Sequence, residues 1–164
     1  MQGMTKRERQ VTDEAQIRQI LDKGRVLHLG LAVDNEPYVV PMNYGYAFEG
    51  EKLVIYLHSA VRGKKLDMIQ INPKVFFEID CDITPFEGKL PCQYGVSYSS
   101  VMGKGIARIV DDVEQKKQAM TVLMKTQTGK DFVFDEKLVS IVTVIRVDVE
   151  AFTAKHRPLP EKMR

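Results

Sequence analysis

The chain has 164 residues, of which 44% are hydrophobic and 28% are charged, and this composition supports one globular domain with a packed core. Its 24 basic and 22 acidic residues give a formal net charge of +2, which does not favour nucleic acid as a partner. No apolar run approaches ~20 residues, as a membrane span would require, and the polar start lacks the apolar core of a signal peptide. Cys81 and Cys92 lack the spacing of a zinc site, so we expect free thiols. These features predict a cytoplasmic protein without a metal or a membrane partner.

The first half of the chain predicts one helix and three strands. Thr12 is the expected N-cap of the helix, with Asp13 and Glu14 in its first turn and Gly24 as its stop. The predicted elements are a helix over about 13–23 and strands over 26–33, 37–48 and 53–58. Pro41 lies inside the second of these strands and indicates an edge strand or a bulge.

The second half predicts two more helices and three more strands. A helix following a basic turn should run to about residue 71, because Asn72-Pro73 ends it. Gly103 and Gly105 indicate a bend or bulge within a long extended segment. In chain order we expect a strand over 75–80, a loop over 82–93, extended chain over 95–110, a helix from Asp111-Asp112 to just before Gly129, and a last strand over 138–152.

Six strands and three helices in this order predict a fold that is mainly β with α. Consecutive hairpins imply antiparallel pairing, and short β-branched strands favour a barrel flanked by helices. A doubly wound sheet is disfavoured, because the strands do not alternate one for one with helices. We expect a single domain over residues 1–164, with a flexible N-terminus over 1–11 and a tail over 156–164.

The most informative segment is the basic turn between the third strand and the second helix. Arg62, Gly63, Lys64 and Lys65 lie where a strand ends and a helix begins. Free N–H groups and the helix dipole favour an anion at such a point, and cations and hydroxyls beside them suit a phosphate monoester. The alternative is a solvated surface. The helix dipole disfavours cations at that position unless an anion is present.

No catalytic residue is fixed by the sequence. His58 ends the third strand and is the one weak candidate, since an imidazole beside a cofactor could donate a proton or a hydrogen bond. The alternative is a hydrogen-bonded histidine at a strand end. Metal-ligand clusters, carboxylate pairs and nucleophile-elbow motifs are absent, so hydrolase and metalloenzyme functions have little support.

Four motifs in order carry a resemblance to a known family. They are Val39–Tyr44, Ile55–Ala60 with Gly63–Leu66, Asn72–Phe77 and Tyr98–Ala107. Over about residues 13–155 the layout resembles the FMN-binding split-barrel family, the pyridoxamine 5'-phosphate oxidase-like flavoproteins. Within that family it is most similar to the nitroimidazole-resistance (Nim-type) branch. The resemblance implies a six-stranded antiparallel split β-barrel.

The resemblance also implies a homodimer with two equivalent FMN sites at the subunit interface. It places Pro41, Met42, Asn43 and Tyr44 along the isoalloxazine ring system, and His58 and Ser59 beside the ribityl phosphate. It assigns Arg62, Gly63, Lys64 and Lys65 to the phosphate itself. Tyr98, Ser99 and Ser100 would approach from the second subunit or from a neighbouring strand.

By this resemblance the protein is an oxidoreductase, nitroreductase-like or related to pyridoxamine 5'-phosphate oxidase. A nicotinamide would supply electrons for a small organic acceptor such as a nitro compound. The alternative is a flavin- or haem-binding protein of the same fold without turnover. A deazaflavin (F420) user is a further possibility, but the long polyanionic tail of that cofactor would require more cations than this turn provides.

Overall fold

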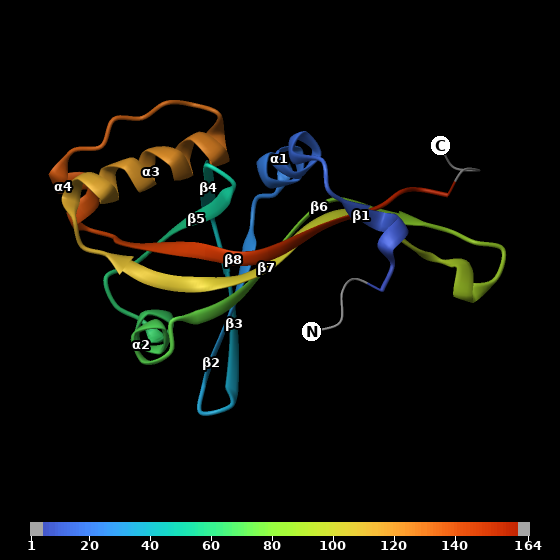
Figure 1. The fold of residues 1–164 in the computed structure, drawn as a ribbon, viewed down its shortest axis with the longest axis horizontal. Helices are drawn as coiled ribbons and strands as arrows, with labels where there is room; N and C mark the ends of the chain where they lie inside the picture. Colours follow the sequence, from blue (N-terminus) through green and yellow to red (C-terminus); the bar gives the residue numbers. More distant parts are fainter. Residues whose placement is uncertain (1–4, 161–164) are drawn as a thin grey trace.

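The computed structural model describes residues 5–160, which form one curved antiparallel sheet with helices packed around it (Figure 1). The strands are β1 (Gln10–Val11), β2 (Leu27–Val33), β3 (Glu36–Met42), β4 (Tyr44–Glu49), β5 (Lys52–Ser59), β6 (Lys74–Phe86), β7 (Gly95–Val110) and β8 (Thr143–Arg157). The helices are α1 (Glu14–Lys23), α2 (Lys64–Ile71), α3 (Val113–Thr128) and α4 (Glu136–Ser140), with short 3-10 turns η1 (Arg7–Arg9) and η2 (Pro91–Gln93). The expected mainly-β fold with helices is confirmed.

The sheet curls into a barrel that stays open along one line. Its hydrogen-bonded order is β3-β2-β6-β7-β8-β5-β4, with β1 added beside β8. β3 and β4 are the two ends of this order, yet only Asn43 separates them in the chain. The two edges must therefore meet at Asn43 without pairing, which is consistent with a split barrel. The described residues contain eight strands, not the six that we expected.

Asn43 also accounts for the first difference from the predicted elements. The apolar segment 37–48 was predicted as one strand, but the chain breaks at Asn43 into β3 and β4, which lie on opposite edges of the split. Periodicity does not reveal such a break, because both halves keep the same alternation. The edge position predicted for Pro41 is confirmed, since β3 is a terminal strand.

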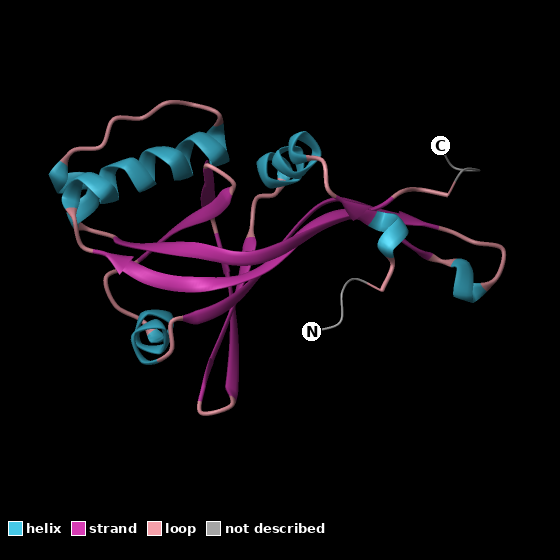
Figure 2. Ribbon diagram, in the orientation of Figure 1, coloured by secondary structure: helices cyan, strands magenta, loops and turns pink. Residues whose placement is uncertain are grey.

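The β6–β7 hairpin is longer than predicted. β6 continues to Phe86 through a bulge between Cys81 and Thr84, so residues 82–86 are strand rather than loop. Asp82 lies at this bulge with a φ of 54°, an uncommon backbone conformation for a residue other than glycine. The irregularity predicted at Gly103 and Gly105 is confirmed by a register shift between Lys104 and Gly105. The far ends of β6, β7 and β8 extend past α1 and away from α2, α3 and α4, with only the short turns η1 and η2 near them (Figure 2).

The C-terminal third differs from prediction in its first residues. Residues 138–140 were expected to start the last strand, but they belong to α4, because the Asp135 side chain accepts a hydrogen bond from Leu138 N at 2.8 Å and caps the helix. The strand begins at Thr143 and continues into the expected tail as far as Arg157. At the other end of the chain, residues 10 and 11 lie in the segment expected to be flexible, yet they form β1 beside β8.

The longer helices are defined by their caps. Asp13, and not Thr12, caps α1, since its carboxylate accepts a hydrogen bond from Gln16 N at 2.9 Å. Asp112 caps α3 in the same way, and Gly129 ends α3 at a φ of 71°, as predicted. The barrel interior holds the main core, and a smaller cluster under α3 and α4 includes Val110 and Val144. Among the described residues no helix is both long and apolar enough to cross a membrane.

Candidate functional site

The predicted basic turn is built as a corner between β5 and α2. Arg62 is the last residue before Gly63, which occupies the N-cap position of α2 at a φ of 148°. This backbone conformation favours glycine, so the sharp entry into the helix depends on that residue. Lys64 and Lys65 begin the first turn, and no side chain of the described residues caps the helix. We call Arg62, Gly63, Lys64 and Lys65 the basic corner.

The electrostatics of the basic corner favour an external anion. The N–H groups of the first helical turn receive no side-chain oxygen, and the positive end of the helix dipole lies beside three cationic side chains. Across residues 5–160, Arg62, Lys64 and Lys65 take part in no ion pair, and Lys64 Nζ instead lies 4.8 Å from the centre of the Tyr38 ring. The corner therefore concentrates positive charge that is offset nearby only by Asp67 in the first turn of α2, which forms no ion pair with these cations among the described residues.

A hollow of about 400 Å³ opens beside the corner. Its walls come from α2, from the end of β7 and from the start of β8: Val61, Arg62, Gly63, Leu66, Asp67, Gln70, Ile109 and Thr143. Arg62 and Gly63 thus border a cavity, whereas a purely solvated surface would leave them on a convex face. Asp67 is the one acidic residue in this wall, and its side chain opposes an anion placed near it.

His58 and Ser59 precede the corner but point to opposite faces of β5. Ser59 is buried on the face of Leu57, and its hydroxyl donates to Ala60 O at 2.7 Å. His58 faces the other way, with Tyr56, toward the cluster under α3 and α4. The buried Nδ1 of His58 has no hydrogen-bond partner among the described residues, and burial lowers the pKa of its imidazole. His58 is therefore mainly neutral at pH 7, a form that can take part in a hydrogen bond through Nε2 but is a weak proton donor.

The low pKa of His58 makes stability depend on pH in a definite direction. An unfolded histidine titrates near 6.5, and the folded state holds His58 neutral to lower pH. The unfolded state thus binds more protons below that value, so the free energy of unfolding should fall as the pH falls through it. A His58→Leu variant should lose less stability between pH 8 and pH 5.5 than the parent does in urea titrations. Equal losses in both proteins would contradict this assignment.

In the segment predicted to line a flavin ring, residues 41–44, two side chains lie at the surface and two in the core. Pro41 and Asn43 are exposed, and Asn43 Nδ2 donates to Arg25 O at 3.2 Å. Met42 is buried, and Tyr44 is fully buried with its hydroxyl donating to Leu21 O at 2.6 Å. Burial also raises the pKa of the Tyr44 phenol. A contact between the Tyr44 side chain and a cofactor would require the ring to leave the core.

The third group of predicted site residues lies near the start of β7 and consists of Tyr98, Ser99 and Ser100. Ser99 is buried and its Oγ lies 2.9 Å from His156 Nδ1. Tyr98 and Ser100 point to the opposite face, where Lys155 Nζ lies 5.7 Å from the centre of the Tyr98 ring. A ligand on one face of the strand could therefore contact Tyr98 and Ser100, and a ligand on the other face only Ser99.

One chain does not bring this group to the basic corner. Ser59 is paired with Thr143 at the start of β8, whereas Ser100 is paired with Lys155, twelve residues further along the same strand. At roughly 3.3 Å per residue the two points are about 35–40 Å apart. The option that Tyr98–Ser100 approach the corner from a neighbouring strand of the same chain thus has no support in this topology.

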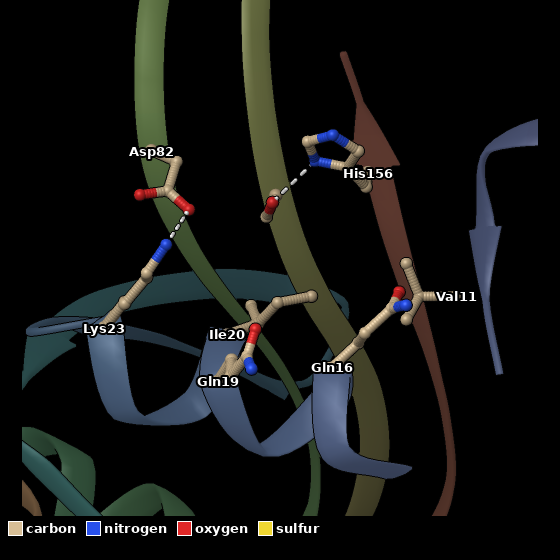
Figure 3. A pocket seen from close by; sticks show the side chains of 8 residues that line it. Val11, Gln16, Gln19, Ile20, Lys23, Asp82 and His156 are labelled. Atoms are coloured by element: carbon tan, nitrogen blue, oxygen red, sulfur yellow. Dashed lines mark hydrogen bonds and ion pairs between the residues drawn. The ribbon is translucent and has the colours of Figure 1, made fainter. Parts of the chain in front are cut away.

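The sequence reasoning missed a second polar cluster, which Figure 3 shows. Lys23 at the end of α1 forms an ion pair with Asp82 at 2.8 Å, and both lie near Ser99 and His156. These residues are distant in sequence, and only the β6 bulge and the extension of β8 bring them together. A lone histidine in a basic tail carries no signal of such a partner.

The fold defines the general class of this protein, an antiparallel split barrel with a cationic corner where β5 meets α2. Comparison with family models narrows that class: residues 13–156 match the model described as pyridoxamine 5'-phosphate oxidase. The match covers most of the chain, so the protein belongs to the pyridoxamine 5'-phosphate oxidase-like family, as the four motifs implied. No curated protein matches the chain.

Solved structures agree with this assignment. A candidate 5-nitroimidazole antibiotic resistance protein from Bacteroides thetaiotaomicron is 28% identical, with a TM-score of 0.75 over 90% of this chain and 86% of that one. A FAD and heme binding protein from Mycobacterium smegmatis is 14% identical (TM-score 0.74; 93% and 76% covered). A FAD-binding protein from Mesorhizobium loti is 24% identical (TM-score 0.62; 90% and 96% covered). The similarity to the last two structures shows only that the fold is shared.

Proposed function

We propose that the protein is an FMN-dependent oxidoreductase that acts as a homodimer on a small organic acceptor such as a nitro compound. The observation that carries this proposal is the basic corner, where three cations lie at the N-terminus of α2 and, within residues 5–160, neither they nor the helix end has a carboxylate partner or a side-chain cap. Such an arrangement is stable when an anion occupies it and is unfavourable when it is empty. Family membership and the similarity to a candidate nitroimidazole resistance protein support a flavin phosphate as that anion.

The residues present fit the phosphate of FMN. Arg62, Lys64 and Lys65 would supply charge-assisted hydrogen bonds, and the backbone of the first turn of α2 would supply N–H donors. One compact cluster suits a single terminal phosphate better than a longer polyanionic tail. When bound, a flavin can take two electrons from a nicotinamide and pass them to an organic acceptor. Because burial favours its neutral form, His58 would contribute a hydrogen bond through Nε2.

The proposed activity has a direct spectroscopic test. The purified protein, as isolated or after incubation with FMN, should absorb near ~450 nm, and NADPH or NADH should bleach that band. Mass analysis of the released small molecule distinguishes FMN from FAD, haem and F420. A folded protein that neither carries nor takes up FMN would exclude the proposal.

A second copy of the chain would complete the site. The start of β7 is too far from the basic corner of its own chain, so Tyr98 and Ser100 would have to serve the corner of a partner. The outer sheet face offers a surface for that partner, because Val39, Gly30 and Phe76 form one row across three strands, with Met102 in the next row. Val39, Phe76 and Met102 are 63%, 48% and 42% exposed, an apolar group of the kind that protein interfaces cover.

Mixed dimers would test this arrangement. One chain would carry Lys64→Ala with Lys65→Ala, and the other Tyr98→Ala with Ser100→Ala, each with its own affinity tag. If each site combines the corner of one chain with β7 of the other, the mixed dimer holds one intact site and one doubly altered site. It should therefore bind about half the FMN of the parent dimer, while each altered homodimer binds weakly. No recovery in the mixed dimer would show that both groups do not act across an interface.

The second candidate function is a flavin- or haem-binding protein without turnover. Its support is the fold shared with the M. smegmatis protein that binds FAD and heme, together with the absence of an acid–base pair beside the corner within the described residues. Steady-state oxidation of a nicotinamide in the presence of a nitro compound separates the two functions. Bound flavin with no turnover above the rate of free FMN would favour this candidate.

A further inference from the structure

A second hollow lies between α1 and the far ends of β6, β7 and β8 (Figure 3). Its volume is about 300 Å³, and we call it the α1 hollow. Its walls are formed by Val11, Gln16, Gln19, Ile20, Lys23, Asp82, Ser99 and His156. It shares no residue with the hollow beside the basic corner, and thus it is a separate cavity of the fold.

Each part of the α1 hollow has a distinct chemical character. Val11 and Ile20 are buried and form an apolar patch. The carboxamides of Gln16 and Gln19 and the Ser99 hydroxyl supply hydrogen-bonding groups of both kinds. Ser99 is held in place by its contact with His156, and Figure 3 shows His156 across the hollow from α1. An apolar patch with a few converging polar groups is typical of a small-molecule site.

One ion pair, between Lys23 and Asp82, lies in the wall of the α1 hollow. Lys23 Nζ and Asp82 Oδ2 are 2.8 Å apart, and the two side chains are 56% and 46% exposed. Exposed ion pairs of this kind add little to stability, so a ligand can open this one at low cost. The bulge in β6 and the positive φ of Asp82 direct its carboxylate toward α1, and an unusual backbone of this kind is often found at functional sites.

We propose that the α1 hollow binds a small zwitterion, a free α-amino acid with an aliphatic side chain. A simple anion could pair with Lys23 but would leave the Asp82 carboxylate without a partner. A simple cation could pair with Asp82 but would leave the Lys23 ammonium without a partner. A ligand with both charges exchanges one internal ion pair for two new ones and leaves no charge unpaired. The volume equals that of about ten water molecules, taking ~30 Å³ for each, and so admits an amino acid of moderate size. The apolar patch would receive its side chain.

Three probes that share the same branched aliphatic chain test the proposal by calorimetry on the full chain. They are L-leucine, 4-methylpentanoate, which lacks the ammonium group, and 3-methylbutylamine, which lacks the carboxylate. L-leucine should bind at least tenfold more tightly than either of the others. Lys23→Gln and Asp82→Asn should each raise its Kd at least tenfold. Asn is chosen at position 82 because it tolerates a positive φ.

A matched control separates this effect from a general loss of charge. Lys125→Gln breaks another exposed ion pair, Lys125–Asp131 at 2.9 Å, and should leave the Kd of L-leucine unchanged. Equal binding of all three probes, no binding of L-leucine, or an unchanged Kd in both α1-hollow variants would overturn the proposal. FMN content, measured on the same samples, reports on the basic corner separately, so failure of either proposal can be recognised by itself.

Discussion

A variant with Lys64→Ala and Lys65→Ala is expected to bind FMN about 100-fold more weakly than the parent. A hydrogen bond to a charged group contributes roughly 1.5–3 kcal/mol, so two lost bonds correspond to roughly 3–6 kcal/mol. Lys64 is exposed and Lys65 half-buried, and solvent screening places the effect at the lower end of that range. Quenching of FMN fluorescence on binding, titrated at fixed ionic strength, gives the two dissociation constants.

The control for this variant must remove the same charge elsewhere. Lys130 and Lys137 are exposed and remote from α2 in the chain, so Lys130→Ala with Lys137→Ala gives the same change in net charge without touching the basic corner. Affinity for FMN should be unchanged in the control. If both double variants bind FMN as the parent does, Lys64 and Lys65 face solvent, which is the alternative that the sequence left open.

The basic corner could be predicted because all of its parts are contiguous in the chain. A strand, a glycine, three cations and a helix follow one another between residues 53 and 71, and local rules for strand ends and helix starts suffice to place them. The structure places Arg62 and Gly63 beside a hollow. Local rules also predicted the end of α3 at Gly129, where the backbone adopts the left-handed conformation that favours glycine.

Features that depend on contacts between distant segments could not be predicted in this way. The separation of β3 from β4 at Asn43 follows from closure of the barrel. Tyr44 is buried against α1, where its hydroxyl donates a hydrogen bond to Leu21 O. A tyrosine on an alternating strand looks the same in sequence whether it faces a cofactor or the core. The cluster around Lys23 and His156 has the same origin, because it requires the register of β6, β7 and β8.

The open edge of the barrel explains why α3 is needed for the fold. β4 is a terminal strand, so one side of its backbone lacks a partner strand. Side chains of α3 satisfy part of that edge: Gln127 Nε2 donates to Tyr44 O at 2.8 Å, and Tyr46 N donates to Thr126 Oγ1 at 3.4 Å. Such contacts require α3 to approach β4 closely, and Gly45 makes this approach possible.

A Gly45→Ala variant should therefore be strongly destabilised. A Cβ at position 45 would overlap Leu123 Cα and would lie 2.5 Å from Leu123 N, so the backbone of α3 would have to move. Overpacking of a core typically costs 1–3 kcal/mol, and we expect about 3 kcal/mol because backbone, unlike a side chain, cannot rotate away. For a chain of this size the loss corresponds to a fall in Tm of roughly 6–12 °C, measured by calorimetry.

Gly129→Ala is the matched control, because it adds the same methyl group where no atom lies within 4 Å. Its φ of 71° makes alanine unfavourable there by about 1 kcal/mol, so its Tm should fall by only a few degrees. A Gly45→Ala variant that melts at or above the Tm of Gly129→Ala would show that α3 is not held against β4 by close backbone contact. The split edge of the barrel would then have to be covered in some other way, such as by a partner chain.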